Sequence, residues 1–336
     1  MSAERLQAMT QFARAALGGA ELAVEVASAD ASFRSYYRVR HAGAPGASWI
    51  VMNAPPDKED TRPFIDIATR LRAAGLSAPE VLASDVGQGF LLLGDLGQQS
   101  YLAALHEHSV DALYGAAMQA LHTMQTAVHC TGLPAYDEAR LRQEMELLPT
   151  WFLMRHLNLQ PGCTGWERIE ACFSLLLRSA LEQPMAFVHR DYHSRNLMVL
   201  AAGNPGILDF QDAVIGPITY DLVSLLKDCY IEWPLERVHG WAESFRLAAV
   251  AQGRLDVGPT RWRRWFDWIG LQRHLKVLGI FARLAYRDGK LGYLKDLPLV
   301  LRYTLNTCAR YGELAGFGEW LESVTRGQDL TRLRAP

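Results

Sequence analysis

The stretch HRDYHSRN occupies residues 189–196, and Leu208-Asp209-Phe210 follows a short distance along the chain. Between them, the apolar runs Met198-Val199-Leu200 and Gly206-Ile207-Leu208 flank the turn-forming sequence Gly-Asn-Pro-Gly. Short apolar runs around such a turn predict a β-hairpin, because glycine, asparagine and proline favour tight reversals. The hairpin would bring Asp209 back toward the end of the first stretch.

The residue types in these two segments predict phosphoryl-transfer chemistry. That reaction needs a carboxylate that orients the attacking hydroxyl and accepts its proton, and Asp191 fits this role. It also needs hard oxygen ligands that hold Mg²⁺ against nucleotide phosphates, and Asn196 and Asp209 supply an amide and a carboxylate. A short pattern of this kind also occurs by chance in solvated loops, but the hairpin and the second carboxylate favour a kinase-type site.

The sequence before this region predicts a small sheet. Residues 22–27, 36–40, 48–52, 80–84 and 89–93 read as strands, and apolar residues between 64 and 71 recur at helical spacing. After Leu93–Gly97 the pattern becomes helical, apart from residues 186–215. We therefore expect an α+β fold with a β-rich N-terminal lobe at residues 1–97 and a helical C-terminal lobe at residues 98–336. The helical segments expected are 101–105, 113–129, 138–157 and 166–181.

The composition excludes several classes of protein. The chain has 336 residues, 49% of them hydrophobic and 21% charged, as in soluble globular proteins. A net charge of −2 without basic clusters disfavours a nucleic-acid partner. Five widely spaced cysteines predict neither a disulfide framework nor a zinc site. No apolar run is long enough to predict a membrane span, so we expect no membrane partner. The cysteine pattern and the lack of a continuous apolar run near the N-terminus lead us to expect a cytoplasmic protein, and we expect a monomer because no sequence feature indicates otherwise.

Several stretches resemble known enzymes. HRDYHSRN, ILDFQDAVIGP and YDLVSLLKD are similar to the aminoglycoside phosphotransferase and choline kinase superfamily, over nearly the whole chain. DASFRSYYRV, MNAPPDKEDTRPF, LPAYDEARLRQEMELLPTWFL and GLQRHLKVLGIFARLAYRDGK resemble bacterial anomeric kinases that phosphorylate N-acetylmuramate and N-acetylglucosamine in cell-wall recycling. The resemblance implies a protein-kinase-like two-lobed fold, ATP and Mg²⁺ as cofactors, and an amino sugar phosphorylated at its C1 hydroxyl.

The resemblance also assigns roles by position. Asp191 matches the base, His189 a histidine that braces the catalytic loop, and Asn196 and Asp209 the metal ligands. Asp221 matches a residue that holds that loop from below, although a helix N-cap is an equally good interpretation. The residues matching the nucleotide-covering turn and the adenine-binding hinge are Ser32, Phe33, Arg34, Leu93, Asp95 and Leu96.

One feature departs from the broad kinase pattern. The third strand, Trp49-Ile50-Val51-Met52-Asn53, lacks the lysine that usually contacts the nucleotide phosphates. Lys58 lies beyond two prolines, so Arg34 or Arg38 would have to supply the charge, and Arg34 in the hairpin turn is the better choice. Its alternative role is that of a solvated turn residue.

Substrate contacts are predicted on the helical part of the chain. Glu144, Trp151 and Arg155 would share one face of the expected helix 138–157. Arginine suits the lactyl carboxylate of N-acetylmuramate. Asp212 either touches a substrate hydroxyl or caps the following turn. The tryptophans at 262, 265 and 268 fit a buried helix face. The predicted substrate contacts are Glu144, Arg155, His193, Asp212 and His274.

Two other functions stay open at this point. A different small-molecule kinase of the superfamily, acting on an aminoglycoside or choline, would require an acidic pocket for its cationic substrate. A catalytically inactive nucleotide-binding protein is the second, because the strand lysine is missing. The intact Asp191, Asn196 and Asp209 argue against inactivity.

Overall fold

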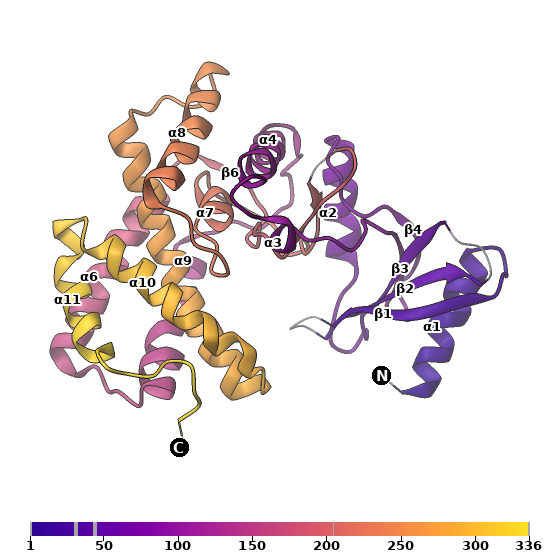
Figure 1. Ribbon diagram of the computed structural model, residues 1–336, viewed down its shortest axis with the longest axis horizontal. Coiled ribbons are helices and arrows are strands. Elements are labelled where there is room, and N and C mark those ends of the chain that lie inside the picture. Colours follow the sequence, from indigo (N-terminus) through magenta and orange to yellow (C-terminus); the bar gives the residue numbers. More distant parts are fainter. Residues whose placement is uncertain (1, 30–32, 43–45, 204, 335–336) are drawn as a thin grey trace. The chain divides into compact units, whose positions relative to one another are not determined.

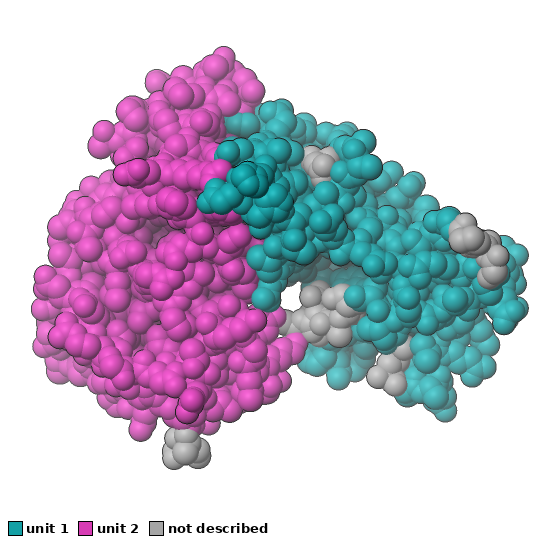
Figure 2. Space-filling view, viewed as in Figure 1, with its two compact units in different colours: residues 1–129, 195–213 teal, residues 130–194, 214–336 magenta. Residues whose placement is uncertain are grey.

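A computed structural model of the chain describes residues 2–29, 33–42, 46–203 and 205–334. The described chain divides into two compact units, which Figure 2 shows in different colours. Unit 1 comprises residues 1–129 and 195–213, and unit 2 comprises residues 130–194 and 214–336.

Unit 1 is built on a five-stranded antiparallel sheet (Figure 1). Its strand order is β1-β2-β3-β5-β4, and helix α2 connects β3 to β4. The predicted strands agree with this sheet to within a few residues. The strands and the connecting helix are β1 (Leu22–Ala29), β2 (Ser35–His41), β3 (Ser48–Asn53), α2 (Arg62–Ala73), β4 (Val81–Asp85) and β5 (Phe90–Gly94).

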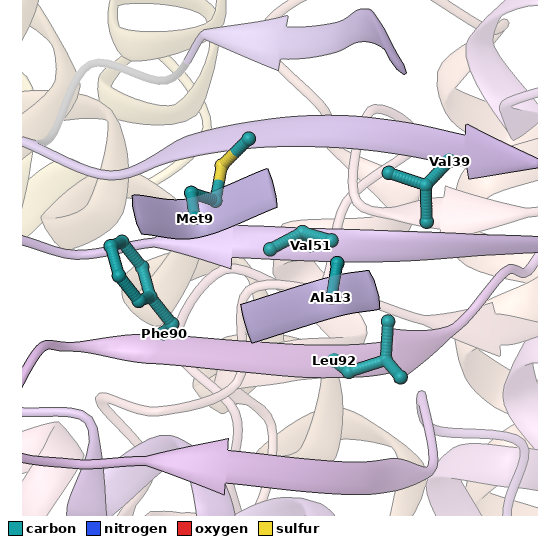
Figure 3. Close-up of a cluster of buried hydrophobic side chains, with 6 residues drawn as sticks. All are labelled: Met9, Ala13, Val39, Val51, Phe90 and Leu92. Carbon is teal, nitrogen blue, oxygen red and sulfur yellow. The ribbon is translucent and has the colours of Figure 1, made fainter. Parts of the chain in front are cut away.

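One face of this sheet is buried beneath helix α1 (Ala3–Ala16). Successive strand residues point to opposite faces, so Phe90 and Leu92 of β5 lie on the same side. Together with Val39 and Val51 they pack against Met9 and Ala13, which stand one helical turn apart on α1 (Figure 3). The other face carries Arg38, Ile50 and Leu93, which are register partners across β2, β3 and β5.

The rest of unit 1 is helical except for the predicted hairpin. Strands β7 (Leu197–Met198) and β8 (Gly206–Ile207) pair in antiparallel register, which confirms that hairpin. The backbone N–H of Leu208 donates to the carbonyl of Asn196 at 2.9 Å, so the pairing extends one step past the strands. Two further helices belong to this unit, α3 (Tyr101–Ala104) and α4 (Val110–Ala127).

Unit 2 is mainly helical around the long helix α9. This helix spans thirty residues and is buried along much of its length, including Trp262, Trp265 and Trp268 as predicted. A two-stranded antiparallel pair, β6 with β9, leads into and out of the region of the catalytic motif. The elements of this unit are α5 (Glu138–Met145), η1 (Leu148–His156), α6 (Gly162–Leu181), β6 (Met185–Val188), β9 (Val214–Pro217), α7 (Tyr220–Leu226), α8 (Leu235–Ala251), α9 (Pro259–Asp288), η2 (Leu291–Asp296), α10 (Leu297–Cys308) and α11 (Gly312–Thr325).

The single helix expected at residues 138–157 is wrong. The segment forms α5 and then η1, a π-helix, with a break between them. A π-helix has more residues per turn than an α-helix, so the spacing that placed Glu144, Trp151 and Arg155 on one face does not hold. Glycine at 279 permits the close packing here, because a Cβ at that position would lie 2.3 Å from the carbonyl carbon of Leu147.

The predicted α+β class is confirmed by this combination of an antiparallel sheet and many helices. The predicted lobes divide the chain once, after residue 97, whereas the compact units divide it at residues 129, 194 and 213. These are different divisions of the chain, and the lobe boundary stays a prediction.

Candidate active site

In unit 2, the loop that carries Asp191 is held by the buried carboxylate of Asp221. Its Oδ2 accepts a hydrogen bond of 2.6 Å from the backbone N–H of His189, and its Oδ1 accepts one of 3.0 Å from that of Arg190. Burial raises the pKa of Asp221 to about 7, although these two bonds and the charge of Arg273 act in the opposite direction. Asp221 therefore braces the loop, rather than capping its own helix, which begins after Thr219.

The loop has an unusual backbone at Arg190, whose φ of 78° lies in the left-handed region. Residues other than glycine adopt this conformation only where surrounding contacts hold it, at a cost of about 1–3 kcal/mol. Asp221 supplies one such contact. His189 supplies another, because its Nδ1 accepts the backbone N–H of Asp191 at 3.2 Å. The side chain of His189 is fully buried, so it positions the loop from the interior.

Asp191 itself is partly open to solvent, with 38% of its side chain exposed. The guanidinium of Arg273 on α9 lies 4.0 Å from its Oδ1 and is almost completely buried. Burial raises the pKa of Asp191, but the charges of Lys276, Arg273, His193 and Arg190 outweigh this effect and lower the pKa to about 2. Asp191 is therefore a carboxylate anion at neutral pH.

Glu144 on α5 is part of a buried ionic network beside this loop. Its carboxylate contacts the guanidinium of Arg190 and the ammonium of Lys276, the latter at 3.0 Å. Tyr136 donates its hydroxyl to the same carboxylate and also lies 3.0 Å from the hydroxyl of Tyr220. Burial raises the pKa of Glu144, but the charges of Lys276 and Arg190 lower it below its usual range. With 13% of its side chain exposed, Glu144 keeps some surface for a ligand.

The other predicted substrate contacts lie in different surroundings. Arg155 is exposed on η1, with its guanidinium 4.9 Å from the ring centre of Tyr286. His193 packs edge-on against Tyr230, and Asp212 is an exposed residue of unit 1 that accepts from Gln211 at 3.4 Å. His274 has no exposed surface, and its predicted contact with substrate stays a prediction.

Unit 1 contains a pocket of about 600 Å³ over the face of the sheet opposite α1. Ile50 and Leu93 line it from paired strand positions, and Met198 and Leu208 line it from the hairpin. The predicted hinge residues Asp95 and Leu96 and the predicted metal ligands Asn196 and Asp209 also line this pocket. The pocket thus combines an apolar part, suited to a flat ring, with a polar end.

Asp95 stabilises the hinge through its side chain. Its carboxylate accepts hydrogen bonds of 2.6 and 3.1 Å from Arg38 and bonds from Ser48 Oγ and the backbone N–H of Gly97. Burial raises the pKa of Asp95, but these partners outweigh it and lower the pKa below its usual range. The Arg38 side chain is therefore engaged by the predicted hinge residue Asp95, which favours Arg34 over Arg38 as the substitute for the missing strand lysine.

Asn196 and Asp209 stand side by side at the end of the hairpin. The Asn196 amide lies 3.4 Å from Asp209 Oδ2. The backbone of Asp209 has a φ of 61°, so this residue, like Arg190, adopts a left-handed conformation although it is not glycine. Arg34 contacts Asp209 Oδ1 at 3.3 Å, and Gln211 donates to the same oxygen at 3.0 Å. Arg34 is thus a largely buried cation in unit 1 next to the predicted metal ligands.

The donor set fits a Mg²⁺ ion that binds together with a phosphate. One carboxylate and one amide oxygen are hard ligands, and Mg²⁺ commonly completes its octahedron with substrate phosphates and water. Among the residues that the structure describes, no group of three or more histidine, cysteine, aspartate or glutamate side chains forms a self-sufficient metal site. Ser32, predicted to cover the nucleotide, lies outside the described residues. Phe33 is exposed and its backbone N–H donates to Glu59.

Two buried cations near Asp191 were not predicted from the sequence to act on that carboxylate. Lys276 is buried within α9 and surrounded in sequence by apolar residues, and Arg273 lies one turn before it on the same helix. A charged side chain is almost never fully buried unless it is paired, so a lysine within such an apolar helix signals a buried partner. The sequence contains that signal, but it does not identify the partner.

These features define the class of protein. A five-stranded antiparallel sheet with one inserted helix precedes a helical part, and an Asp-bearing loop and a hairpin that carries Asn196 and Asp209 follow, as in phosphotransferases of the protein-kinase type. The model of the phosphotransferase enzyme family, APH, matches residues 23–265. The chain belongs to this family.

Sequence relatives and a solved structure agree with this assignment. A protein of Pseudomonas aeruginosa named N-acetylmuramate/N-acetylglucosamine kinase is 48% identical, over 90% of this chain and 89% of that protein. A protein of the same name from Pseudomonas putida is 44% identical, over 90% of this chain and 88% of that protein. The GDP complex of aminoglycoside 2'-phosphotransferase-IIIa has a TM-score of 0.63 at 15% identity, covering 90% of this chain and 99% of that one. The predicted protein-kinase-like fold is confirmed.

A membrane-spanning helix is not found among the residues that the structure describes.

Proposed function

We propose that this enzyme transfers the γ-phosphoryl group of ATP to the anomeric C1 hydroxyl of N-acetylmuramate and N-acetylglucosamine. The observation that carries the proposal is the extent of identity, 40–48% over about 90% of the chain, to relatives that bear the names of these sugar kinases. The sugars and the enzyme class follow from those relatives. The C1 position follows from the resemblance of the sequence to anomeric kinases.

The pocket of unit 1 is the proposed nucleotide site. Its apolar residues suit adenine, and the backbone between Leu93 and Leu96 would form hydrogen bonds with the ring edge. Arg34 is the proposed phosphate ligand in place of the missing lysine, because it is the cation beside Asp209. Ser32 and Phe33 precede it in the turn that would cover the nucleotide.

Asn196 and Asp209 are the residues that would hold Mg²⁺. The ion, when bound with the nucleotide, neutralises phosphate charge and orients the transferred group. The two ligands are adjacent, and Gln211 holds one oxygen of the carboxylate. Their pairing at the hairpin end supports this role.

Asp191 is the proposed base, and it would accept the proton of the C1 hydroxyl. In the transfer, the bond between the sugar oxygen and phosphorus forms, and the bond between phosphorus and the leaving oxygen of ADP breaks. His189 and Asp221 keep the loop in place, so their role is positioning. Glu144, Arg155, His193 and Asp212 stay proposed sugar contacts, with Glu144 nearest to the catalytic loop through its pair with Arg190.

The charges near Asp191 favour this substrate over a cationic one. The positive charges of Arg190, Arg273 and Lys276 all act on Asp191, so the base does not lie in an acidic environment. An aminoglycoside or choline would bring a further positive charge to this region, at an electrostatic cost. A neutral or anionic amino sugar would bring no such positive charge and would avoid this cost. We further propose that the enzyme acts as a cytoplasmic monomer in peptidoglycan recycling, without nucleic-acid or membrane partners.

Release of ADP from ATP and Mg²⁺ tests the proposal with a panel of acceptors: N-acetylmuramate, N-acetylglucosamine, glucose, kanamycin and choline. We expect turnover with the two N-acetyl sugars. Turnover only with kanamycin or choline would replace the substrate and keep the enzyme class. ATP binding without turnover of any acceptor would favour the inactive nucleotide-binding protein.

A further inference from the structure

Two cations on helix α9, Arg273 and Lys276, act on the proposed base Asp191. Arg273 and Lys276 are three residues apart on α9, so both project from the same side of it. Their side chains are 4% and 6% exposed, whereas the carboxylate that they influence is open to solvent. Because both are nearly buried, neither is available as a general anion-binding surface.

Lys276 is held in place by two partners other than Asp191. Its ammonium lies 3.0 Å from Glu144 Oε1 and 3.2 Å from the hydroxyl of Tyr220. Glu144 is in turn fixed by Arg190 and Tyr136. The network therefore anchors a positive charge at one location and limits its movement.

The charged and titratable groups around Asp191 come from four structural elements. Arg190 and His193 belong to its own loop, Asp221 and Tyr220 to α7, and Arg273 and Lys276 to α9. Glu144 of α5 pairs with both Lys276 and Arg190, and the guanidinium of Arg273 lies 4.0 Å from Asp191 Oδ1. Burial raises the pKa of Asp191, but Lys276 and Arg273 contribute the largest opposing effects and bring the pKa to about 2.

We propose that Arg273, which lies 4.0 Å from Asp191 Oδ1, and Lys276, which is fixed beside Glu144, are positioning residues that keep the Asp191 carboxylate oriented and ionised. This inference rests on the proposed role of Asp191 as the base. Its chemical consequence suits the proposed acceptor. A carboxylate stabilised as an anion takes up a proton weakly, and an anomeric hydroxyl gives up its proton more readily than an ordinary alcohol.

The test is the titration of Asp191, followed by carboxyl NMR of enzyme with ¹³C-labelled aspartate and assigned by comparison with Asp191→Asn. In the wild type we expect its midpoint well below the ordinary value of about 3.9. In Lys276→Met the midpoint should rise by about one pH unit or more, since a nearby opposite charge lowers a carboxyl pKa by about 1–3 units. Lys276→Arg should restore the wild-type midpoint.

Lys227→Met is the matched control. Lys227 is also buried, but its ammonium is paired with Asp267 at 2.6 Å, and it is not one of the four charged groups with the largest effects on Asp191. It should leave the titration of Asp191 unchanged. If Lys276→Met does not fold, Arg273→Met serves as the second variant with the same expected shift. The acidic limb of kcat/KM for N-acetylglucosamine should move by the same amount as the midpoint.

A wild-type Asp191 that titrates at or above about pH 4 would overturn the proposal, and so would an unchanged midpoint in the folded Lys276 and Arg273 variants. The titration requires no sugar and no turnover. Failure of the proposed substrate would therefore appear as inactivity on the sugar with the titration shift intact, and failure of this inference as activity without the shift.

Discussion

The backbone N–H of His189 donates a 2.6 Å hydrogen bond to the buried carboxylate of Asp221. This bond fixes the start of the loop that carries Asp191. The second oxygen of that carboxylate holds Arg190 in its left-handed conformation. Asp221→Ala should therefore leave two N–H groups without their acceptor, each at a cost of about 1–3 kcal/mol. We expect a lower free energy of unfolding in urea, together with a lower kcat. Asp221→Asn, which retains one acceptor oxygen, should be less damaging, and equal stability of Asp221→Ala and wild type would contradict this role.

Replacement of the base should reduce turnover and leave nucleotide binding intact. Asp191→Asn keeps the size of the side chain but removes the proton acceptor, which typically costs about 10²–10⁴-fold in rate. Steady-state kcat with N-acetylglucosamine measures the loss, and equilibrium binding of ATP serves as the control. A variant with near-normal kcat would disprove the assignment.

Loss of the Arg34 charge should weaken ATP binding. A hydrogen bond to a charged group contributes about 1.5–3 kcal/mol, so Arg34→Met should raise the KM for ATP by about tenfold or more. Arg62→Met is the matched control, because Arg62 forms an exposed pair with Asp60 in the same unit. An unchanged KM in Arg34→Met would show that another cation contacts the phosphates, such as Arg38 or Arg195, which both line the pocket.

Packing between α9 and η1 should not tolerate a side chain at position 279. In Gly279→Ala the new Cβ would lie 2.3–2.5 Å from atoms of Leu147, including backbone atoms. The backbone would have to shift, and overpacking of this kind costs about 1–3 kcal/mol. Gly240→Ala in the exposed middle of α8 meets no atom within 4 Å and should instead stabilise by about 0.5–1 kcal/mol. Thermal unfolding of both variants gives the comparison, and equal melting temperatures would contradict it.

Burial of His274 should make stability depend on pH. Burial lowers its pKa to about 3, below the ordinary value of about 6.5 in the unfolded chain. The unfolded state therefore binds the proton more tightly, so this contribution is fully present above about pH 6.5 and is lost as pH falls toward 3. His274→Gln, which can still donate to the carbonyl of Lys227, should flatten the slope of unfolding free energy against pH in this range. An unchanged slope would show that His274 titrates normally.

The sequence predicted the sheet, the hairpin and the burial of the tryptophans of α9, because these follow from local periodicity and turn residues. It did not predict η1. The chain at the start of η1 packs closely against Gly279, which lies far away in the sequence, and local spacing does not reveal such a tertiary contact. The alternation of apolar residues is similar in an α-helix and a short π-helix.

The sequence motifs predict roles for Asp191, Asn196 and Asp209, and these roles stay predictions. The surroundings of Asp191 were not predictable, because the pairing of Glu144 with Lys276 depends on tertiary packing of α5 against α9. The same limit applies to Arg38. The sequence allows this residue to contact a phosphate, whereas in the structure its guanidinium donates to Asp95.

The most direct test of the account locates the phosphate on the product. Wild-type enzyme is incubated with ATP, Mg²⁺ and N-acetylglucosamine, and the sugar product is examined by ¹H–³¹P correlation NMR. The account predicts a single phosphate coupled to the anomeric proton, and Asp191→Asn should yield almost none of it. A phosphate on any other hydroxyl of the sugar, or no sugar phosphate from the folded wild-type enzyme, would contradict it.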